Sequence, residues 1–277
     1  NCVILVSEID FPGMGFALQK SLPEDCEIRF IPSNVDITNA RVWDEYLTKD
    51  VDLVFVSHAY SNTGQLSPIS QVLSMARARN IISILDIAQS VGIVPIDLKA
   101  LNPDFMIGSS VKWLCGGPGA AYLWVNSDRL ASCNPKDVGW FSHENPFEFD
   151  IHNFRYRDSA LKFWGGTPSI APYAIATHSI NYFTNIGLKN IRQHNQLLIE
   201  KTANALDLEF VSPREEAIRG GTMILDFGVN QQKILKQLKE HNISVDLRSH
   251  GIRISPHIYN DEEDIDQLLS VIKSTKL

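Results

Sequence analysis

Two residues of opposite charge, Asp86 and Lys112, follow predicted strands and could do chemistry together. Asp86 ends an apolar run in ILDIAQSVG, and Lys112 lies just beyond another strand, in GSSVKWLCGGPGAA. Their spacing equals one crossover unit, and ligands of open α/β sheets bind at the carboxyl ends of the strands. A carboxylate there needs a positive partner. A lysine flanked by hydroxyls and glycines suits a Schiff base with a phosphate close by.

Both residues also have simpler interpretations. Asp86 could cap the helical segment that follows it, and the turn around Lys112 could be a phosphate-binding loop of another kind. The sequence contains no GxxxxGK[ST] motif, and no GxGxxG follows an early strand. Nucleoside triphosphates and dinucleotides are therefore disfavoured as ligands.

The first half of the chain predicts the sheet that would position these residues. Short β-branched runs alternate with amphipathic stretches such as the predicted helix 69–79. Near-continuous apolar strands separated by helices are typical of a parallel sheet covered on both faces. The predicted strands are 2–7, 27–32, 52–58, 82–87, 104–110 and 120–125.

The second half differs in character. Residues 132–166 are rich in aromatic, Asn, Asp and Pro residues and show little periodicity, which is typical of a long functional loop. We expect an α/β fold with a large domain over 1–170, containing a mainly parallel sheet, and a small C-terminal α+β domain over 171–277. The small domain is predicted from helices at 171–183, 188–206, 231–241 and 262–273, a strand at 222–227 and two short strands.

The amino-acid composition limits the kinds of partner and the cellular compartment that we expect for this chain. The 277 residues are 44% hydrophobic and 21% charged, with a net charge of −7 and no Lys/Arg block, so nucleic acid is not an expected partner. No apolar run approaches the roughly 20 residues that cross a bilayer. The four cysteines form no CxxC, which favours free thiols, no structural zinc and a reducing, cytoplasmic compartment. The chain begins inside a predicted strand without an initiator Met, so we expect upstream residues to be absent.

DIAQSVGIVPIDL followed by DFMIGSSVKWLCGGPGAAYLWV resembles the class V aminotransferase family of fold-type I (aspartate aminotransferase-like) pyridoxal-phosphate enzymes. Further matches are DFPGMGFAL, GWFSHENPFEFD, GGTPSIAP and IRISPHIYNDEEDIDQLL, so the resemblance covers essentially the whole chain. The opening segment and the GWF-H segment look most similar to kynureninases and kynureninase-like aminotransferases. Family members are longer, and their additional N-terminal portion carries a phosphate-binding loop.

The resemblance implies roles for individual residues. Lys112 forms the Schiff base with pyridoxal phosphate and shuttles the α-proton, Asp86 pairs with the pyridinium nitrogen, and Arg253 binds the substrate α-carboxylate. Further cofactor contacts are implied for Phe11 on the ring face, for Gln89 near the phenolic oxygen, for Ser109 and Ser110 near the phosphate, and for Trp140, Gly166 and Thr167 on a segment that reaches the neighbouring subunit's cofactor.

Each supporting role has an alternative. Gln89 could be a surface residue, Phe11 a core residue, and Arg248 either a surface ion pair or a site residue. Trp140 and His143 could simply pack the long loop. The acidic run 261–264 is most simply the first turn of the last helix, where the helix dipole favours it.

Departures from the family pattern shape the functional expectation. Val111 stands where kynureninases carry Tyr, Gln89 where they carry His, and Met14 or Gly15 where they carry an acid. The segment VDLRSHGIR lacks the cysteine that a cysteine desulfurase needs. We therefore expect a class V aminotransferase acting as a homodimer with shared sites on a small α-amino acid and a keto acid. A kynureninase-type hydrolase is the alternative enzyme, and a non-catalytic relative is the alternative from another class.

Overall fold

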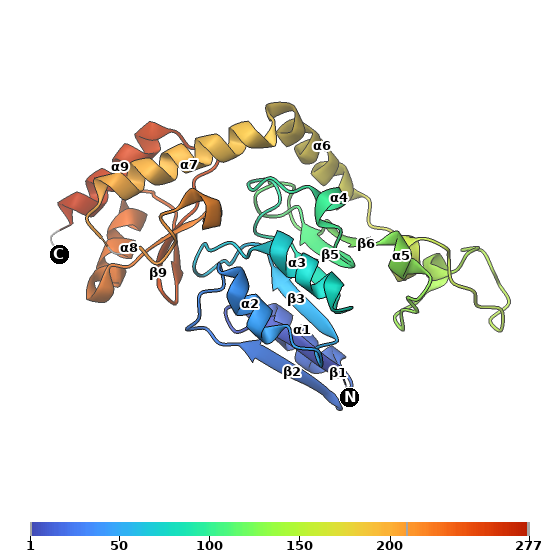
Figure 1. Cartoon of the computed structure of the whole chain (residues 1–277). Coiled ribbons are helices and arrows are strands. Elements are labelled where there is room, and N and C mark those ends of the chain that lie inside the picture. Colours follow the sequence, from blue (N-terminus) through green and yellow to red (C-terminus); the bar gives the residue numbers. More distant parts are fainter. Residues whose placement is uncertain (1, 209, 276–277) are drawn as a thin grey trace.

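A computed structural model of the chain describes residues 2–208 and 210–275. Within these ranges a six-stranded sheet has the order β2-β1-β3-β4-β5-β6 (Figure 1). Its first five strands run parallel and β6 pairs antiparallel with β5, which confirms the mainly parallel sheet. The strands are β1 (Cys2–Ser7), β2 (Cys26–Ile31), β3 (Leu53–Ser57), β4 (Ile82–Asp86), β5 (Phe105–Ser109) and β6 (Ala121–Val125).

The main core lies between this sheet and the helices that follow its inner strands. Trp43 of α2 (Ala40–Tyr46) and Val72 of α3 (Ile69–Ala78) are fully buried against Val54 and Leu85 of the sheet. By contrast, α1 (Pro12–Ser21) has no buried residue. Short helices α4 (Leu98–Leu101) and α5 (Ser127–Leu130) complete the first half. Burial of continuous apolar strands thus fixes the register that brings the ends of β3, β4 and β5 together.

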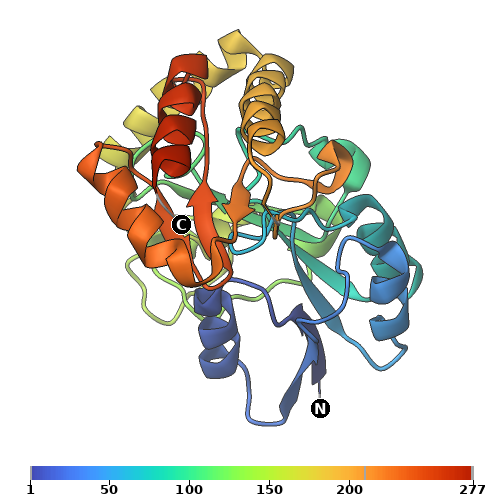
Figure 2. The ribbon, with the colours of Figure 1, turned by 90° about the vertical axis from the view of Figure 1, so that its left-hand side faces the viewer.

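A second sheet of order β7-β9-β8 forms with the C-terminal helices, and it has its own hydrophobic core. Figure 2 shows these elements gathered together, beside the carboxyl end of the large sheet. They are α6 (Ala171–Ile186), α7 (Leu188–Ala205), β7 (Met223–Leu225), α8 (Gln231–Glu240), β8 (Asp246–Arg248), β9 (Gly251–Ile254) and α9 (Glu262–Ser274). The elements expected here are confirmed, and the domain boundary at residue 170 stays a prediction.

The long segment between α5 and α6, which the structure describes throughout, contains no α-helix or β-strand. Its regular structure consists of two short 3-10 helices, η1 (Trp140–Ser142) and η2 (Ala160–Phe163). Figure 1 shows it projecting away from the large sheet. His143 organises part of it, because its ring nitrogens lie 2.8 Å from the carbonyl oxygens of Asn145 and Asn153. This contact gives His143 a packing role within the loop.

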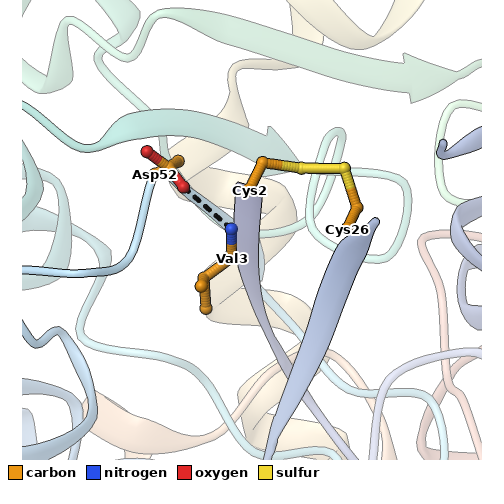
Figure 3. Close-up of a disulfide and its surroundings, with 4 residues drawn as sticks. All are labelled: Cys2, Val3, Cys26 and Asp52. Atoms are coloured by element: carbon orange, nitrogen blue, oxygen red, sulfur yellow. Dashed lines mark hydrogen bonds between the residues drawn. A yellow bond between two sulfur atoms is a disulfide. The ribbon is translucent and has the colours of Figure 1, made fainter. Parts of the chain in front are cut away.

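One expectation about the cysteines is wrong. Cys2 and Cys26 form a disulfide rather than free thiols, as Figure 3 shows. The two residues are in-register partners at the beginnings of β1 and β2, with their Cα atoms 4.6 Å apart. Their separation of 24 residues gives no spacing signal, because only the parallel pairing of the strands brings them together. The argument from cysteine usage to a reducing compartment loses this support, although Cys115 and Cys133 are free.

Next to the disulfide, the backbone amide of Val3 donates to the Asp52 carboxylate at 2.8 Å (Figure 3). The beginning of β1 is therefore tied both to β2 and to the segment that leads into β3. Among the described residues, no helix is long and apolar enough to span a membrane.

Candidate active site

Asp86 is the last residue of β4, and its carboxylate is mostly withdrawn from water. It accepts a hydrogen bond from the backbone amide of Ala88 at 2.7 Å. The residues after it form turns rather than an α-helix, so this contact is a local turn and not a helix cap. Burial raises the pKa of Asp86, while the Ala88 amide and the charge of Lys112 act in the opposite direction. The carboxylate is thus held where a cation would stabilise it.

Lys112 lies in the turn between β5 and β6. The backbone amide of Gly116 donates to the Ser110 carbonyl at 2.7 Å, and that of Cys115 donates to the Lys112 carbonyl at 2.9 Å, which closes the turn. Burial lowers the pKa of the Lys112 amine, Asp86 raises it, and the arginines at 253 and 248 lower it. A lowered pKa makes an amine a better nucleophile near neutral pH. The two charged residues expected to share one crevice do interact.

Phe11 lies beside this lysine, at the start of α1. The Lys112 ammonium is 5.9 Å from the centroid of the Phe11 ring, and the ring is 55% exposed. An exposed flat ring is not a core residue, so its alternative interpretation as core does not hold. Its face is free to stack on a planar ligand.

Arg253 comes from the second sheet, on β9. Its guanidinium lies 2.9 Å from the Asp246 carboxylate on β8, and Arg248 lies 2.5 Å from the same carboxylate oxygen. Burial lowers the pKa of Arg253, as does the charge of Arg248. Two arginines and one carboxylate therefore form a linked group at this side of the site.

Phe11, Lys112 and Arg253 line one cavity of about 480 Å³, whereas Asp86 is not among its lining residues. It lies between the carboxyl edge of the large sheet and the second sheet, and residues from both line it. The lining residues are Phe11, Ser61, Gln89, Lys112, Trp113, Thr222, Arg248, Arg253, Ser255, His257 and Tyr259. The sequence-predicted Phe11, Gln89, Lys112 and Arg253 are thus brought together around it.

Other predicted residues lie apart from this cavity. The Ser110 hydroxyl is fully buried and donates to the Ala120 carbonyl at 3.1 Å, so it serves the turn. Trp140, Gly166 and Thr167 belong to the projecting loop, and Ser109 ends β5. None of these five residues lines the cavity within the described part of the chain. Their contacts with a cofactor stay predictions.

Several residues near the site are absent from the sequence-based prediction. Asp10, which precedes Phe11, is 8% exposed, and its Oδ1 has no hydrogen-bond partner among the described residues. Burial raises the pKa of Asp10 to about 7. His58 follows β3, donates its backbone amide to the Asp86 carbonyl at 2.8 Å, and has a pKa lowered by burial to about 4. The sequence alone does not indicate that Asp10 and His58 lie near the site, because only the folded sheet brings the ends of these strands together.

Tyr122 approaches Asp86 from β6. Its hydroxyl is buried and has no hydrogen-bond partner among the described residues, and burial together with the charge of Asp86 raises its pKa to about 12. Its ring lies over Gly108 on β5, where an added Cβ would come within 2.5 Å of the ring. Glycine at 108 is therefore what allows the tyrosine to lie there.

The cavity fits a planar aromatic cofactor with a cationic ring nitrogen and a carbonyl carbon. Asp86 is a largely buried carboxylate that accepts a hydrogen bond from the Ala88 amide and forms no ion pair at salt-bridge distance within the described residues. The Lys112 amine has no hydrogen-bond partner in the same part of the chain, and the exposed face of Phe11 lies beside it. A carboxylate without a direct cation, an available amine and an open aromatic face match the chemistry of pyridoxal phosphate.

The fold and this donor set define a fold-type I pyridoxal-phosphate protein. Residues 3–268 match the family model described as aminotransferase class-V, so the chain belongs to that family. Members of the family use pyridoxal phosphate, which confirms the cofactor class expected from the sequence.

Curated relatives carry two different names. The chain is 29% identical over 287 residues to a kynureninase from Shouchella clausii, covering 98% of this chain and 66% of that protein. It is 24% identical over 275 residues to the uncharacterized aminotransferase YcbU from Bacillus subtilis, covering 97% of this chain and 71% of that protein. The chain thus spans about two thirds of the length of these relatives, and the names do not decide between the two reactions.

Solved structures share the fold. A cysteine desulfurase from Thermococcus onnurineus NA1 aligns with a TM-score of 0.85 at 21% identity, covering 99% of this chain and 72% of that one. A complex of the cystine C-S lyase C-DES with cysteine persulfide aligns with a TM-score of 0.86 at 22% identity, covering 100% and 76%. At this level of identity the likeness establishes the fold and not the reaction.

Proposed function

We propose that this chain belongs to a pyridoxal-phosphate enzyme that transfers the amino group of a small α-amino acid to a keto acid. The observation that carries the proposal is the convergence of Lys112, Arg253 and Gln89 on one cavity, with Asp86 interacting electrostatically with Lys112. An amine, a buried carboxylate and a guanidinium are the groups that amino-group chemistry on a carboxylic acid requires.

Each group has a distinct task. Lys112 would hold pyridoxal phosphate through its amine and would remove and return the α-proton of the substrate. Asp86 keeps the ring nitrogen protonated, and Arg253 binds the α-carboxylate with its planar fork. When bound, pyridoxal phosphate withdraws electrons from the substrate's α-carbon. Phe11 and Gln89, which line the cavity, would help to hold the cofactor, Phe11 through its ring face and Gln89 through its side-chain amide.

Kynurenine-type hydrolysis is the second candidate, favoured by the aromatic lining of the cavity. Phe11, Trp113, His257 and Tyr259 all line it, and the last two rings stack with centroids 5.1 Å apart. Such a surface suits an aromatic side chain. Against it stand Val111 and Gln89, which replace the residues usual in kynureninases.

Sulfur transfer is not proposed. Only Ser249 and His250 separate β8 from β9, so no cysteine-bearing loop precedes Arg253. Cys115 is free and its Sγ lies 4.0 Å from His257 Nε2, but burial raises the pKa of this thiol, which disfavours the nucleophilic thiolate.

The assembly and location also belong to the proposal. We propose a homodimer in which the projecting loop, with Trp140, Gly166 and Thr167, completes the partner's site. The large domain would span 1–170 and the small domain 171–277. A cytoplasmic location is retained as a proposal, and the redox state of Cys2 and Cys26 in cell extracts prepared under acid quenching would test it.

Labelling with borohydride tests the central claim. Borohydride reduces a carbon–nitrogen double bond, so it should fix the cofactor on Lys112 of the purified holoprotein. Peptide mapping should find the label on Lys112 alone, and Lys99→Arg, an exchange on the surface helix α4, should leave it unchanged. A label on another lysine would overturn the assignment.

An amino-acid screen then separates the reactions. Transamination releases a keto acid and transfers the amino group to an added acceptor, whereas kynurenine hydrolysis releases an aromatic amine and alanine without an acceptor. Bound cofactor with no turnover in either assay would favour a non-catalytic relative.

A further inference from the structure

The β8–β9 hairpin contains three charged residues, of which the proposed chemistry uses only Arg253. Asp246 and Arg253 are directly opposed partners in the antiparallel register, and Arg248 lies two residues along the same strand as Asp246. Because side chains alternate along a strand, Asp246 and Arg248 lie on one face. All three side chains therefore meet on one face of the hairpin.

A single oxygen of Asp246, Oδ2, forms an ion pair with Arg248 at 2.5 Å and accepts a hydrogen bond from Arg253 at 2.9 Å. The two arginines line the cavity with Lys112, whereas Asp246 is not among the lining residues and its side chain is 48% exposed. The Arg248 Nε is buried and has no other partner in the described chain. The contact with Asp246 is thus the main neutralising contact of Arg248.

The balance of charge at the cavity then limits what it can accept. Arg248 and Arg253 carry two positive charges and Asp246 one negative charge, so these three residues have a net charge of +1. Under the proposed function, on which this inference rests, Lys112 holds the cofactor and the α-carboxylate at Arg253 neutralises this remaining charge. A second acidic group would then find no net positive charge on the three residues, and would have to approach the Asp246 carboxylate.

We infer that Asp246 is a specificity-determining residue: by pairing with Arg248 it disfavours α-amino acids with an acidic side chain. Asp246 acts through the arginines and does not itself touch the substrate. Freed from Asp246, Arg248 would become a site for a second carboxylate, so Asp246→Asn should shift the preference towards dicarboxylic amino acids such as aspartate.

The geometry of the hairpin keeps this arrangement fixed. Gly251 is the partner of Arg248 in the register, and a Cβ there would come within 2.3 Å of the Leu225 carbonyl on β7. The glycine allows β9 to pack closely on β7 while the two-residue turn brings Arg248 back towards Asp246. A charged pair held on a paired strand discriminates better than one on a mobile loop.

Binding of amino acids to the holoprotein tests the inference without requiring turnover. Dissociation constants for alanine and aspartate are measured from the change in cofactor absorbance, and their ratio is compared between variants. The protein should prefer alanine, and Asp246→Asn should move the ratio towards aspartate by about tenfold, as expected for one new charged hydrogen bond. Asp246→Glu, which keeps the charge, should retain the original preference.

The variant Arg248→Met should change the ratio of the alanine and aspartate dissociation constants in the opposite direction. It removes the cation while Asp246 stays, so aspartate should bind more weakly relative to alanine, and the double variant Asp246→Asn/Arg248→Met should lose the tenfold gain. A gain that persists without Arg248, an unchanged ratio in Asp246→Asn, or an original preference for aspartate would overturn the inference. If no amino acid changes the absorbance of the original protein, it is the proposed function that fails.

Discussion

At the scale of single residues, the electrostatics of the candidate site depend on which carboxyl groups stay ionised. Asp86 has the Lys112 charge nearby and a backbone amide bonded to it, whereas Asp10 has an unpartnered buried oxygen. Burial raises the pKa of both acids, but only Asp86 also has the charge of Lys112 acting against that rise. Asp86 is therefore the acid that can pair with a cationic ring nitrogen, whereas Asp10, with a pKa of about 7, changes its charge near neutral pH.

Replacing Asp86 by Asn should separate cofactor binding from catalysis. The amide keeps the shape of the side chain but cannot keep a ring nitrogen protonated, so turnover should fall by roughly 10²–10³, as for the loss of one electrostatic contact. Absorbance should show that the cofactor remains bound, and steady-state rates measure the loss. Near-normal turnover would mean that another acid faces the ring.

Asp10 should make stability depend on pH. Its pKa is about 7 in the folded protein against an ordinary value of 3.8, because burial disfavours the charge. Between these values the folded state binds a proton that the unfolded state has lost, so stability falls as pH rises from about 4 to about 7, by an amount on the order of a few kcal/mol.

The variant Asp10→Asn should therefore be more stable than the original protein at pH 8 and no more stable at pH 4.5. Urea unfolding midpoints at the two pH values give the comparison. If the midpoints of the variant and the original protein differ by the same amount at pH 8 and at pH 4.5, Asp10 does not titrate in this range.

At the scale of elements, the sequence predicts most strands of the large sheet because they are continuous apolar runs. It does not predict α1, which contains Gly13 and Gly15 and buries no residue, so no apolar periodicity marks it. Lys112 and Asp86 could be found because they follow recognisable strands. Thr222, Ser255, His257 and Tyr259 could not, because they reach the cavity only when the second sheet meets the edge of the first.

Close packing of β9 on β7 should make Gly251 intolerant of a side chain. Gly251→Ala would bring a Cβ within 2.3 Å of the Leu225 carbonyl, at a φ of 154°, and should destabilise the protein by about 1–3 kcal/mol, the usual cost of overpacking. Gly15→Ala is a suitable control, since nothing lies within 4 Å of its added Cβ. Thermal unfolding of the two variants should differ clearly, and equal midpoints would contradict the close approach.

At the scale of the whole molecule, the projecting loop is the feature that a single chain leaves unexplained. Phe147, Phe149 and Ile151 are 66%, 88% and 89% exposed, and they belong to the same long segment between α5 and α6 as Gly166 and Thr167. A large exposed apolar surface of this kind is usually covered by a partner. A two-fold dimer in which each loop lies against the other subunit's cavity would bury it and would bring Thr167 to the cofactor phosphate.

Mixing two inactive variants tests this assembly. Lys112→Ala lacks the amine, and Thr167→Trp should block the phosphate contact with a bulky ring. If each site combines Lys112 of one subunit with Thr167 of the other, a hybrid dimer contains one site with both residues intact. Random exchange of equal amounts makes half of the dimers hybrid, so activity should recover to about a quarter of the original, while each variant alone stays inactive. Demonstrated exchange of subunits without recovery, or a monomer at the working concentration, would reject shared sites. As a control, Lys112→Ala alone is taken through the same exchange procedure. It forms no hybrid dimers, so it should remain inactive.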